Sequence, residues 1–265
     1  MHRTCGSWLA SDEALSNTPQ AQGFLLVHAG PIIAPLTDGH ELRMTTTTAP
    51  YAAPDAAPRR GRKNNPEKTR ENILQAAITE FVQQGLAGAR VDAIAERTQT
   101  SKRMIYYYFN SKEQLYVEVL EKLYGDIRST ETNLHLDELE PRQGIRRLIE
   151  FTFDHHDRNV DFVRIVCNEN MHHGEFVKQS SAIRSMNKTV LLALNEVLRR
   201  GADDGLFRKG LDALDVHLLI SSFCFYRVSN RHTFGEIFQI DFEDQVVKAR
   251  HKEMICESVL RYLQA

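Results

Sequence analysis

One spacing of apolar residues, which continues from Asn65 almost to the end of the chain, constrains the fold most. In its first stretch, apolar side chains recur every three or four residues, which places them on one face of a helix. These residues are Ile73, Leu74, Ala77, Ile78, Phe81 and Val82. The same spacing recurs in 112–125, 142–156, 160–170, 175–200, 211–230 and 242–264. Proline or glycine separates many of these stretches, and none shows the alternation of a strand over a convincing length. The sequence therefore predicts an all-α protein.

Residues 1–58 have a different character. They are rich in proline, threonine and alanine and show no helical or strand period. Such a segment buries too little apolar surface to offset the entropy lost on ordering, so we expect it to be unstructured. A further hypothesis is that translation starts at Met44. Asn65 is a good N-cap and Pro66 suits the first helical position, whereas Gly85 is expected to end that helix.

The net charge of −2 conceals an uneven distribution of charge. Residues 59–122 carry 12 Lys and Arg against 8 Asp and Glu, a net charge of +4. Residues 1–58 (2 against 5) and 123–265 (19 against 22) each carry a net charge of −3. One basic segment in an otherwise acidic chain is typical of nucleic-acid binding. The four cysteines are isolated, which fits a reducing cytoplasm, and no apolar run is long enough to span a membrane.

The segment from Val91 to Leu115 predicts a helix-turn-helix. A short helix with an apolar face is followed by a polar break at 98–100, and Ser101 can cap a second helix over 102–109. In that second helix Ile105, Tyr108 and Phe109 share one face. The opposite face carries Lys102, Arg103, Tyr106 and Tyr107. Two cations and two phenols on an exposed helix are suited to phosphates and base edges in a major groove.

This stretch resembles the DNA-binding domain of the TetR family of bacterial repressors. The resemblance covers about 50 residues and rests on the upstream sequence ILQAAITEFVQQG and on Ile94, Ala95, Ser101, Tyr106, Phe109, Ser111, Lys112, Glu113 and Leu115. Three positions depart from the family pattern. Gln99 replaces a turn glycine, Thr100 replaces a valine, and Arg90 replaces a Thr or Ser that caps a helix.

The resemblance implies a DNA-binding domain at 59–120, a ligand-binding and dimerisation domain at 121–265, and three partners: double-stranded operator DNA, a small-molecule effector and a second copy of the chain. The last two long helices, about 211–228 and 242–264, are expected to form the dimer interface. Their apolar residues are Leu214, Leu218, Leu219, Phe223, Phe225, Val246, Val247, Met254, Ile255, Val259, Leu260 and Leu263. The alternative is that these faces only close the core of one subunit.

The expected DNA contacts are Arg62, Lys63, Arg90, Ser101, Lys102, Arg103, Met104, Tyr106, Tyr107 and Lys112. The basic run that ends in Arg62 and Lys63 is either a solvated linker or an arm on phosphates or in the minor groove. Arg103 is expected to read a base, and Lys112 and Tyr106 are expected to contact phosphates.

The ligand-binding residues are harder to predict, because they must be recognised as polar or aromatic groups within apolar helices. The candidates are His155, Asn168, His172, Phe176, Tyr226, Arg227 and Asn230. Arg227 can pair with a ligand carboxylate, or form an intersubunit or intrahelical ion pair. The segment 224–238 is weakly similar to repressors of aromatic-acid and nicotinate catabolism, which favours an aromatic or carboxylate effector. No metal and no cofactor are expected, because the paired histidines lack completing ligands.

Two other functions compete with this interpretation. An all-α enzyme would need a nucleophile with its base, a phosphate loop or a metal constellation, and the sequence contains no GxSxG, P-loop, HExxH or DxD pattern. A regulator of the same fold that needs no ligand, such as a nucleoid-associated factor, is the second alternative.

Overall fold

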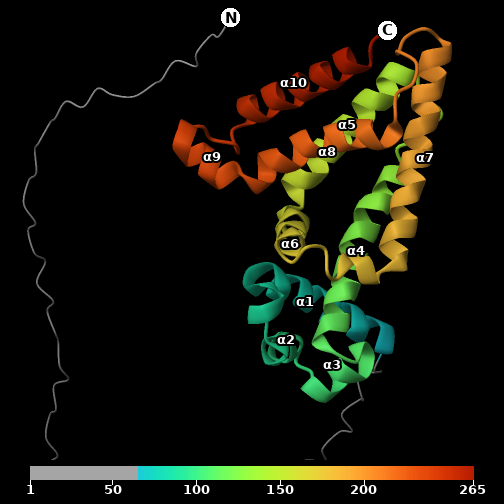
Figure 1. Ribbon diagram of the computed structural model, residues 1–265. Helices are drawn as coiled ribbons and strands as arrows, with labels where there is room; N and C mark the ends of the chain where they lie inside the picture. The colour runs from blue at the N-terminus through green and yellow to red at the C-terminus, as the bar shows by residue number, and fades with distance from the viewer. Residues whose placement is uncertain (1–64) are drawn as a thin grey trace, which may run out of the picture. The chain divides into compact units, whose positions relative to one another are not determined.

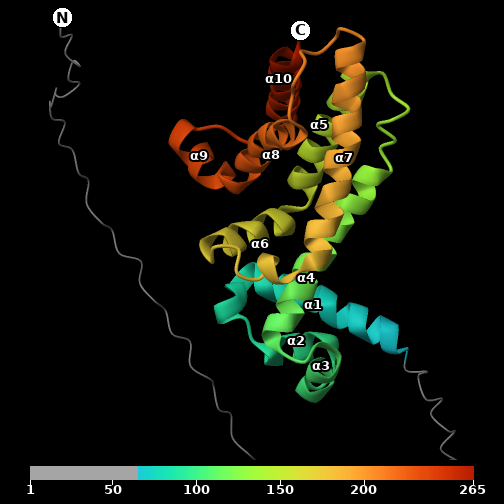
Figure 2. The ribbon, with the colours of Figure 1, turned by 45° about the vertical axis from the view of Figure 1, so that its right-hand side comes forward.

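The computed structural model describes residues 65–265, which form ten α-helices and one 3₁₀ turn (Figures 1 and 2). Within this range no β-strand occurs, and the only extended pairing is an isolated bridge between Phe207 and Gln264. The all-α prediction is therefore confirmed for residues 65–265. The predictions made for residues 1–58, Met44, Arg62 and Lys63 lie outside the described residues.

The first helix, α1 (Pro66–Gly88), begins as predicted. The Asn65 side chain accepts hydrogen bonds from the backbone N–H groups of Glu67 and Lys68, which have no partners inside the helix. Gly85 adopts a positive φ of 64° and interrupts the helix, but one further turn follows it. The predicted end of the helix is therefore a kink, at a conformation that glycine adopts without steric cost.

Three helices complete the N-terminal part: α2 (Val91–Thr98), α3 (Lys102–Phe109) and α4 (Lys112–Thr132). The α4 helix is continuous from its cap at Ser111 to Asn133, and Gly125 lies inside it without breaking it. The helix predicted over 112–125 is confirmed, and it continues to Thr132. Because α4 begins beside α3 and extends between the C-terminal helices, it joins the two ends of the described structure (Figure 1).

The C-terminal helices are α5 (Pro141–Arg158), α6 (Val160–Met171), α7 (Ser181–Asp203), α8 (Ala213–Ser229), α9 (Arg231–Phe238) and α10 (Gln245–Leu263). Two expectations need correction. The helix predicted from residue 175 starts at Ser181, after the 3₁₀ turn η1 (Val177–Gln179). Between the stretches predicted as helical at 211–230 and 242–264, the structure adds a helix that the apolar spacing did not indicate, α9, which begins directly after the cap residue Asn230.

The helix-turn-helix does not have a hydrophobic core of its own. Phe81, Phe109 and Tyr116 are buried together with Ile165 from α6 and with Phe176 from the segment before α7. The ring of Phe176 packs edge-on against Tyr116, with 5.2 Å between the ring centroids. Because a close-packed core transmits displacements, a shift of α6 or of the 172–180 segment reaches α4 and the helices it supports.

A buried carboxylate fixes the segment between α6 and α7. Glu169 Oε1 accepts hydrogen bonds from the backbone N–H groups of Phe176 (2.6 Å) and Val177 (2.9 Å). Burial, together with the nearby Glu169 carboxylate, raises the pKa of the Tyr116 hydroxyl well above its usual range. The Glu169 side chain thus connects α6, the 172–180 segment and α4 at one point.

A second core closes the opposite end of the structure, where α5, α7, α8 and α10 meet. The helical stretch predicted to end at residue 200 continues through Gly201, which lies inside α7. The ring of Phe207 occupies the space that a Cβ at Gly201 would need. This glycine therefore serves packing rather than chain reversal.

Candidate nucleic-acid interface and effector cavities

The turn between α2 and α3 has the geometry expected of a helix-turn-helix in spite of its unusual residues. Gln99 adopts the left-handed conformation, with φ 52° and ψ 36°, where a glycine would cost less. Ser101 caps α3 as predicted, because its hydroxyl accepts a hydrogen bond from the N–H of Met104. The departure at Gln99 therefore leaves the turn intact.

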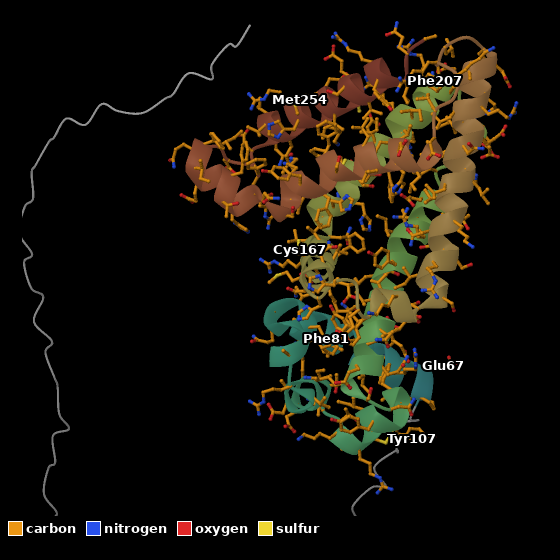
Figure 3. The ribbon with its side chains drawn as sticks, in the orientation of Figure 1. Glu67, Phe81, Tyr107, Cys167, Phe207 and Met254 are labelled. Atoms are coloured by element: carbon orange, nitrogen blue, oxygen red, sulfur yellow. The ribbon has the colours of Figure 1, made fainter. Side chains whose placement is uncertain are left out.

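The two faces of α3 separate as the sequence predicts. Ile105 and Phe109 are 1% and 0% exposed, whereas Tyr106 and Tyr107 are 43% and 76% exposed. Tyr108 is half-buried beside the core. Tyr107 lies at the tip of the structure, on the helix that projects farthest from the C-terminal helices (Figure 3). The outward face of α3 is thus free to meet a large partner.

The charged groups of this face are exposed. Lys102 Nζ lies 2.6 Å from Asp92 Oδ1 on α2, and both side chains are about half exposed. Such an ion pair contributes little stability in water, so a phosphate can replace the aspartate at small cost. Arg103 is exposed and forms no ion pair with the residues that the structure describes. These two cations are the groups that the surface offers to an anion or a base edge.

A shallow cleft of about 420 Å³ lies beside α3, where the first turns of α2 and α4 meet. Arg90, Lys102, Tyr106 and Lys112 line it. Arg90 occupies the N-cap position of α2 but makes no side-chain capping bond, so first-turn N–H groups of α2 lack a side-chain acceptor. Two carboxylates, Asp92 and Glu113, also line the cleft, so its attraction for a phosphate depends on the cations together with the partial positive charge of the helix N-termini.

Lys112 has a role that the sequence did not reveal. Its ammonium donates hydrogen bonds to the carbonyl oxygens of Leu86 (2.8 Å) and Ala89 (3.3 Å). It therefore ties the start of α4 to the end of α1 in the unbound protein. The phosphate contact proposed for Lys112 competes with these two carbonyls and stays a prediction.

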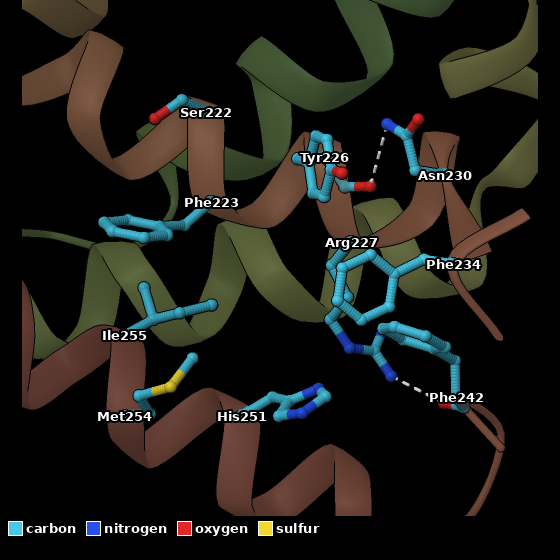
Figure 4. Close-up of a pocket in the computed structure, with 10 residues that line it drawn as sticks. All are labelled: Ser222, Phe223, Tyr226, Arg227, Asn230, Phe234, Phe242, His251, Met254 and Ile255. Carbon is cyan, nitrogen blue, oxygen red and sulfur yellow. Dashed lines mark hydrogen bonds between the residues drawn. The ribbon is translucent and has the colours of Figure 1, made fainter. Parts of the chain in front are cut away.

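The seven predicted ligand residues do not gather at one place. Tyr226, Arg227 and Asn230 line a cavity of about 400 Å³ among α8, α9 and α10, together with four aromatic rings from Phe223, Phe234, Phe242 and His251 (Figure 4). Phe242, which follows α9, and His251, on α10, also line this cavity. The role of these residues in ligand binding stays a prediction.

Arg227 is 6% exposed and already has partners. Its Nη1 donates to Asp157 Oδ1 (2.6 Å) on α5, and its Nη2 donates to the carbonyl oxygen of Phe242 (2.6 Å). Burial opposes ionisation of Asp157, but hydrogen bonds from Lys248 and Arg227 hold the pKa of this carboxyl below its usual range. Of the alternatives from the sequence, the structure shows an ion pair, and it joins two helices of one subunit rather than two subunits or one helix.

The other four ligand candidates are scattered. Phe176 belongs to the core beneath the helix-turn-helix, and His172 is exposed beyond the end of α6. Asn168 lines a small cleft of about 210 Å³ between α6 and α8. His155 lies in the interior beside Phe151 and Phe162, with ring centroids 5.7 and 5.8 Å away. The apolar spacing predicted helices around these residues, but it did not show which helix faces meet or that His172 and Phe176 lie between helices.

Five polar residues form a largely buried cluster, of which the sequence analysis named only His155. They are Arg128, Glu131, His155, His156 and His217. Arg128 and Glu131 form an ion pair on α4, with side chains 12% and 5% exposed. Burial, with a smaller contribution from the charge of Arg128, lowers the pKa of each of the three histidines to about 4. The histidines are therefore neutral near pH 7. A signal was present in the sequence, since Arg128 and Glu131 have the three-residue spacing of a helix ion pair.

A second cavity, of about 520 Å³, lies between α4 and α7 and has Arg128 and Glu131 in its wall. Its remaining wall combines apolar or small residues, such as Gly125, Met186 and Val190, with polar residues that include Asp137 and Glu196. The volumes of this cavity and of the one near Arg227 fall within the usual range for small-molecule sites.

An apolar surface covers the outer faces of the last helices. Seven large side chains of α8 and α10 are between 38% and 74% exposed: Leu214, Leu218, Phe223, Tyr226, Val246, Met254 and Tyr262. Other residues from the predicted interface, Ile255, Val259 and Leu263, are instead buried within the subunit. The monomer-core alternative thus accounts for part of the predicted interface, and the exposed remainder lacks a partner within the described chain.

Residues 65–265 were searched for membrane-spanning helices and for metal-binding groups of side chains. No helix there is both long and apolar enough to cross a bilayer. The same residues contain no group of three or more His, Cys, Asp or Glu side chains arranged to hold a metal ion.

Comparison with known sequence families gives two matches. The pattern described as "Bacterial regulatory proteins, tetR family" matches residues 73–119. The pattern described as "Tetracyclin repressor-like, C-terminal domain" matches residues 141–259. The two matches coincide with the helix-turn-helix and with α5–α10.

Characterised relatives are transcription regulators. The chain is 35% identical over 203 residues to the HTH-type transcriptional repressor NicS of Pseudomonas putida, covering 77% of this chain and 96% of NicS. It is 30% identical over 155 residues to the HTH-type transcriptional regulator TtgR of the same species, covering 52% of this chain and 70% of TtgR.

Solved structures show the same fold. The fatty acid degradation regulator FadR from Bacillus halodurans superposes with a TM-score of 0.57 at 19% identity, over 75% of this chain and 97% of that one. The ketosteroid transcriptional regulator KstR2 of Mycobacterium tuberculosis gives a TM-score of 0.55 at 19% identity, over 74% of this chain and 95% of that one. At this identity the likeness concerns the fold alone.

Proposed function

The chain belongs to the TetR family of bacterial transcription regulators, and we propose that it is a dimeric repressor that a small-molecule effector releases from an inverted-repeat operator. The family makes it a DNA-binding regulator rather than an enzyme. The observation that carries the proposal is the outward face of α3, on which Lys102, Arg103, Tyr106 and Tyr107 are exposed beside a buried Ile105 and Phe109.

The contacts with DNA divide into two kinds. Arg103 is the candidate for base recognition, since a guanidinium can donate two hydrogen bonds to a guanine edge. Arg90, Lys102 and Tyr106 surround the cleft beside the first turns of α2 and α4 and are placed to hold a phosphate. Ser101 and Met104 lie at the start of α3, where a recognition helix enters the groove.

The apolar outer faces of α8 and α10 support a dimer. Leu214, Leu218 and Val246 are at least 60% exposed, which costs free energy unless another surface covers them. A two-fold axis through this surface would present two copies of α3. To meet successive major grooves on one side of DNA, these helices must lie about 34–36 Å apart, so we expect an operator with inverted repeats.

The effector is proposed to act through α4. This helix holds Lys112 against the end of α1 and, four to five turns later, Arg128 and Glu131 beside a cavity. A ligand that prefers the conformation unable to bind DNA would tilt α4 and separate the two recognition helices. Its effect is limited by its difference in affinity between the two conformations.

Salt dependence of DNA binding tests the regulator function. The logarithm of the association constant should fall linearly with the logarithm of salt concentration, by roughly 0.9 per neutralised phosphate. Removal of residues 1–63 should reduce that slope, because it removes Arg62 and Lys63, but it should leave sequence preference unchanged. An unchanged slope would remove the arm from the proposal, and binding that is independent of salt and sequence would contradict it altogether.

Reciprocal linkage tests the effector. Operator DNA should weaken effector binding by the same factor by which the effector weakens DNA binding. A regulator that needs no ligand would instead give no stabilisation with any member of a broad panel of small acids in thermal unfolding.

A further inference from the structure

The start of α2 lacks the side chain that usually caps a helix. Arg90 is its N-cap residue, with an extended backbone at φ −117° and ψ 123°, but it forms no side-chain capping bond. Ser, Thr, Asp and Asn cap well because an oxygen on a short side chain can accept from free N–H groups, whereas the guanidinium of arginine has only donors. The backbone at this point is instead held from another helix.

Glu80, on α1, supplies an acceptor. Its Oε1 atom accepts a hydrogen bond of 3.0 Å from the backbone N–H of Arg90. Its Oε2 atom lies 3.9 Å from Nη2 of Arg97, in the last turn of α2. Arg97 is itself bound to α1, because its Nη1 donates to the carbonyl oxygen of Ala76 (3.3 Å). One carboxylate thus reaches both ends of α2 and ties them to α1.

The burial of Glu80 distinguishes it from a surface ion-pair residue. Glu80 is 6% exposed and lies on the core-facing side of α1, one turn after Ala76 and Ala77. A carboxylate in such a place costs free energy unless hydrogen bonds satisfy it. An apolar side chain of similar volume fills such a position without that cost and often leaves stability unchanged or higher. The contribution of this carboxylate therefore lies in the geometry that it imposes on α2.

We propose that Glu80 is a positioning residue for DNA binding, because it acts as the acceptor of a capping box that is supplied from α1. In an ordinary capping box, a Glu or Gln three positions after the N-cap accepts from the N-cap N–H. In α2 that position is Ala93, which has no acceptor in its side chain. Glu80 accepts from the same N–H and so holds Arg90 at the cleft beside α3. This inference rests on the proposed phosphate contact of Arg90.

The consequence is an effect on DNA affinity. Arg90 shares its cleft with Lys102 and Tyr106 of α3, so the three groups meet one phosphate only when the start of α2 is fixed. Without an acceptor at position 80, the N–H of Arg90 loses its partner and the first turn of α2 frays in a fraction of the molecules. Apparent affinity falls with the competent fraction, so a fraction of about one tenth weakens binding roughly tenfold.

Three variants separate the hydrogen bond from the charge. Glu80→Gln keeps an oxygen acceptor and loses only the charge near the half-exposed Arg97, so it should bind DNA within about twofold of the wild type. Glu80→Leu loses the same charge and also the acceptor, and should weaken binding roughly tenfold. The double variant E80L/A93E restores an acceptor at the ordinary capping-box position and should recover wild-type affinity.

The sign of the expected change excludes an electrostatic cause. Removal of a negative charge near the cleft favours binding to a phosphate backbone, so a weaker Glu80→Leu complex cannot result from the charge. Glu80→Gln is the matched control, since it has the same net charge as Glu80→Leu. Thermal unfolding should show that Glu80→Leu is folded at the temperature of the binding assay, because leucine suits the apolar surroundings.

Two measurements on the full chain are needed. Fluorescence anisotropy gives the affinity for the duplex that the wild-type protein selects from a random DNA library. Hydrogen exchange of the backbone amide of Arg90, followed by NMR without DNA, reports the hydrogen bond itself. We expect this amide to exchange slowly in the wild type, in Glu80→Gln and in E80L/A93E, and rapidly in Glu80→Leu.

Several outcomes would overturn the inference. Wild-type affinity of Glu80→Leu would do so, as would an equal loss with Glu80→Gln and Glu80→Leu. A double variant with a protected Arg90 amide but no recovery of affinity would show that Glu80 only supports the fold. Rapid exchange of the Arg90 amide in the wild type would decide against the inference even if Glu80→Leu does not fold.

The same samples separate this inference from the proposed function. Wild-type protein that binds no specific DNA contradicts the proposed function. Specific DNA binding by the wild type, together with full affinity of Glu80→Leu, contradicts only the role of Glu80. Arg90→Gln tests the link between the two, since it should weaken binding while the amide of residue 90 still exchanges slowly. Unchanged affinity of Arg90→Gln would contradict the phosphate contact through which Glu80 acts.

Discussion

Arg103 is the side chain on which base recognition depends. It is exposed on α3 and has no ion-pair partner among the described residues, so its donors are available to a base. We expect Arg103→Ala to relax the preference at one position of each half-site, at a cost of about 1–3 kcal/mol. Tyr106→Phe, which removes only a phenol hydroxyl, should weaken binding evenly across sequences. Binding-site selection from a random DNA library measures both effects, and an even loss with Arg103→Ala would make Arg103 a phosphate contact.

Lys112 should affect stability as well as DNA binding. Its ammonium satisfies the carbonyls of Leu86 and Ala89, where α1 ends and α2 approaches. We expect Lys112→Met, which keeps the apolar stem, to lower the free energy of unfolding by about 1–3 kcal/mol because two carbonyls lose a charged donor. Lys102→Met is the matched control, since its pair with Asp92 is exposed and should contribute less than 1 kcal/mol. Denaturant unfolding distinguishes them, and equal values for the two variants would refute the structural role of Lys112.

The packing of helix α7 against Phe207 requires a residue without a side chain at position 201. A Cβ at Gly201 would collide with the ring of Phe207, which is 2% exposed and belongs to the second core. We expect Gly201→Ala to destabilise the protein by about 1–3 kcal/mol through overpacking, although alanine is the better helix former. Gly125→Ala in α4 is the control, because its Cβ would lie 3.7 Å from Met186 Sδ, an ordinary contact. That variant should gain about 0.5–1 kcal/mol, so thermal unfolding should show shifts of opposite sign.

Dimer formation should depend on the outer faces of α8 and α10. Leu218, on α8, is 64% exposed, and Leu192, on α7, is 71% exposed, so the two offer a comparison at equal burial within one subunit. We expect Leu218→Asp to give a monomer in sedimentation and to weaken operator binding roughly tenfold or more, because one recognition helix then binds alone. Leu192→Asp should remain dimeric with unchanged DNA affinity. If both variants stay dimeric, the α8 and α10 surface is not the interface.

The sequence by itself determined the local features of this protein. The helical period, the caps at Asn65 and Ser101, and the division of α3 into a buried and an exposed face depend on neighbours within four residues, and the structure confirms them. The same local signals located the helix-turn-helix and, through it, the family. They sufficed because capping, turn formation and amphipathic patterning are short-range effects.

Only the tertiary structure decided which side chains meet across helices. It pairs Arg227 with Asp157, 70 residues away, and brings Lys112 to the end of α1, 26 residues away. It also places Phe176 beneath the helix-turn-helix and Arg128 in the wall of a cavity. The periodicity of a helix indicates which residues share a face, but the rotation of that helix against its neighbours is set by packing of the whole core. The candidate ligand sites therefore became visible only once the helices were assembled.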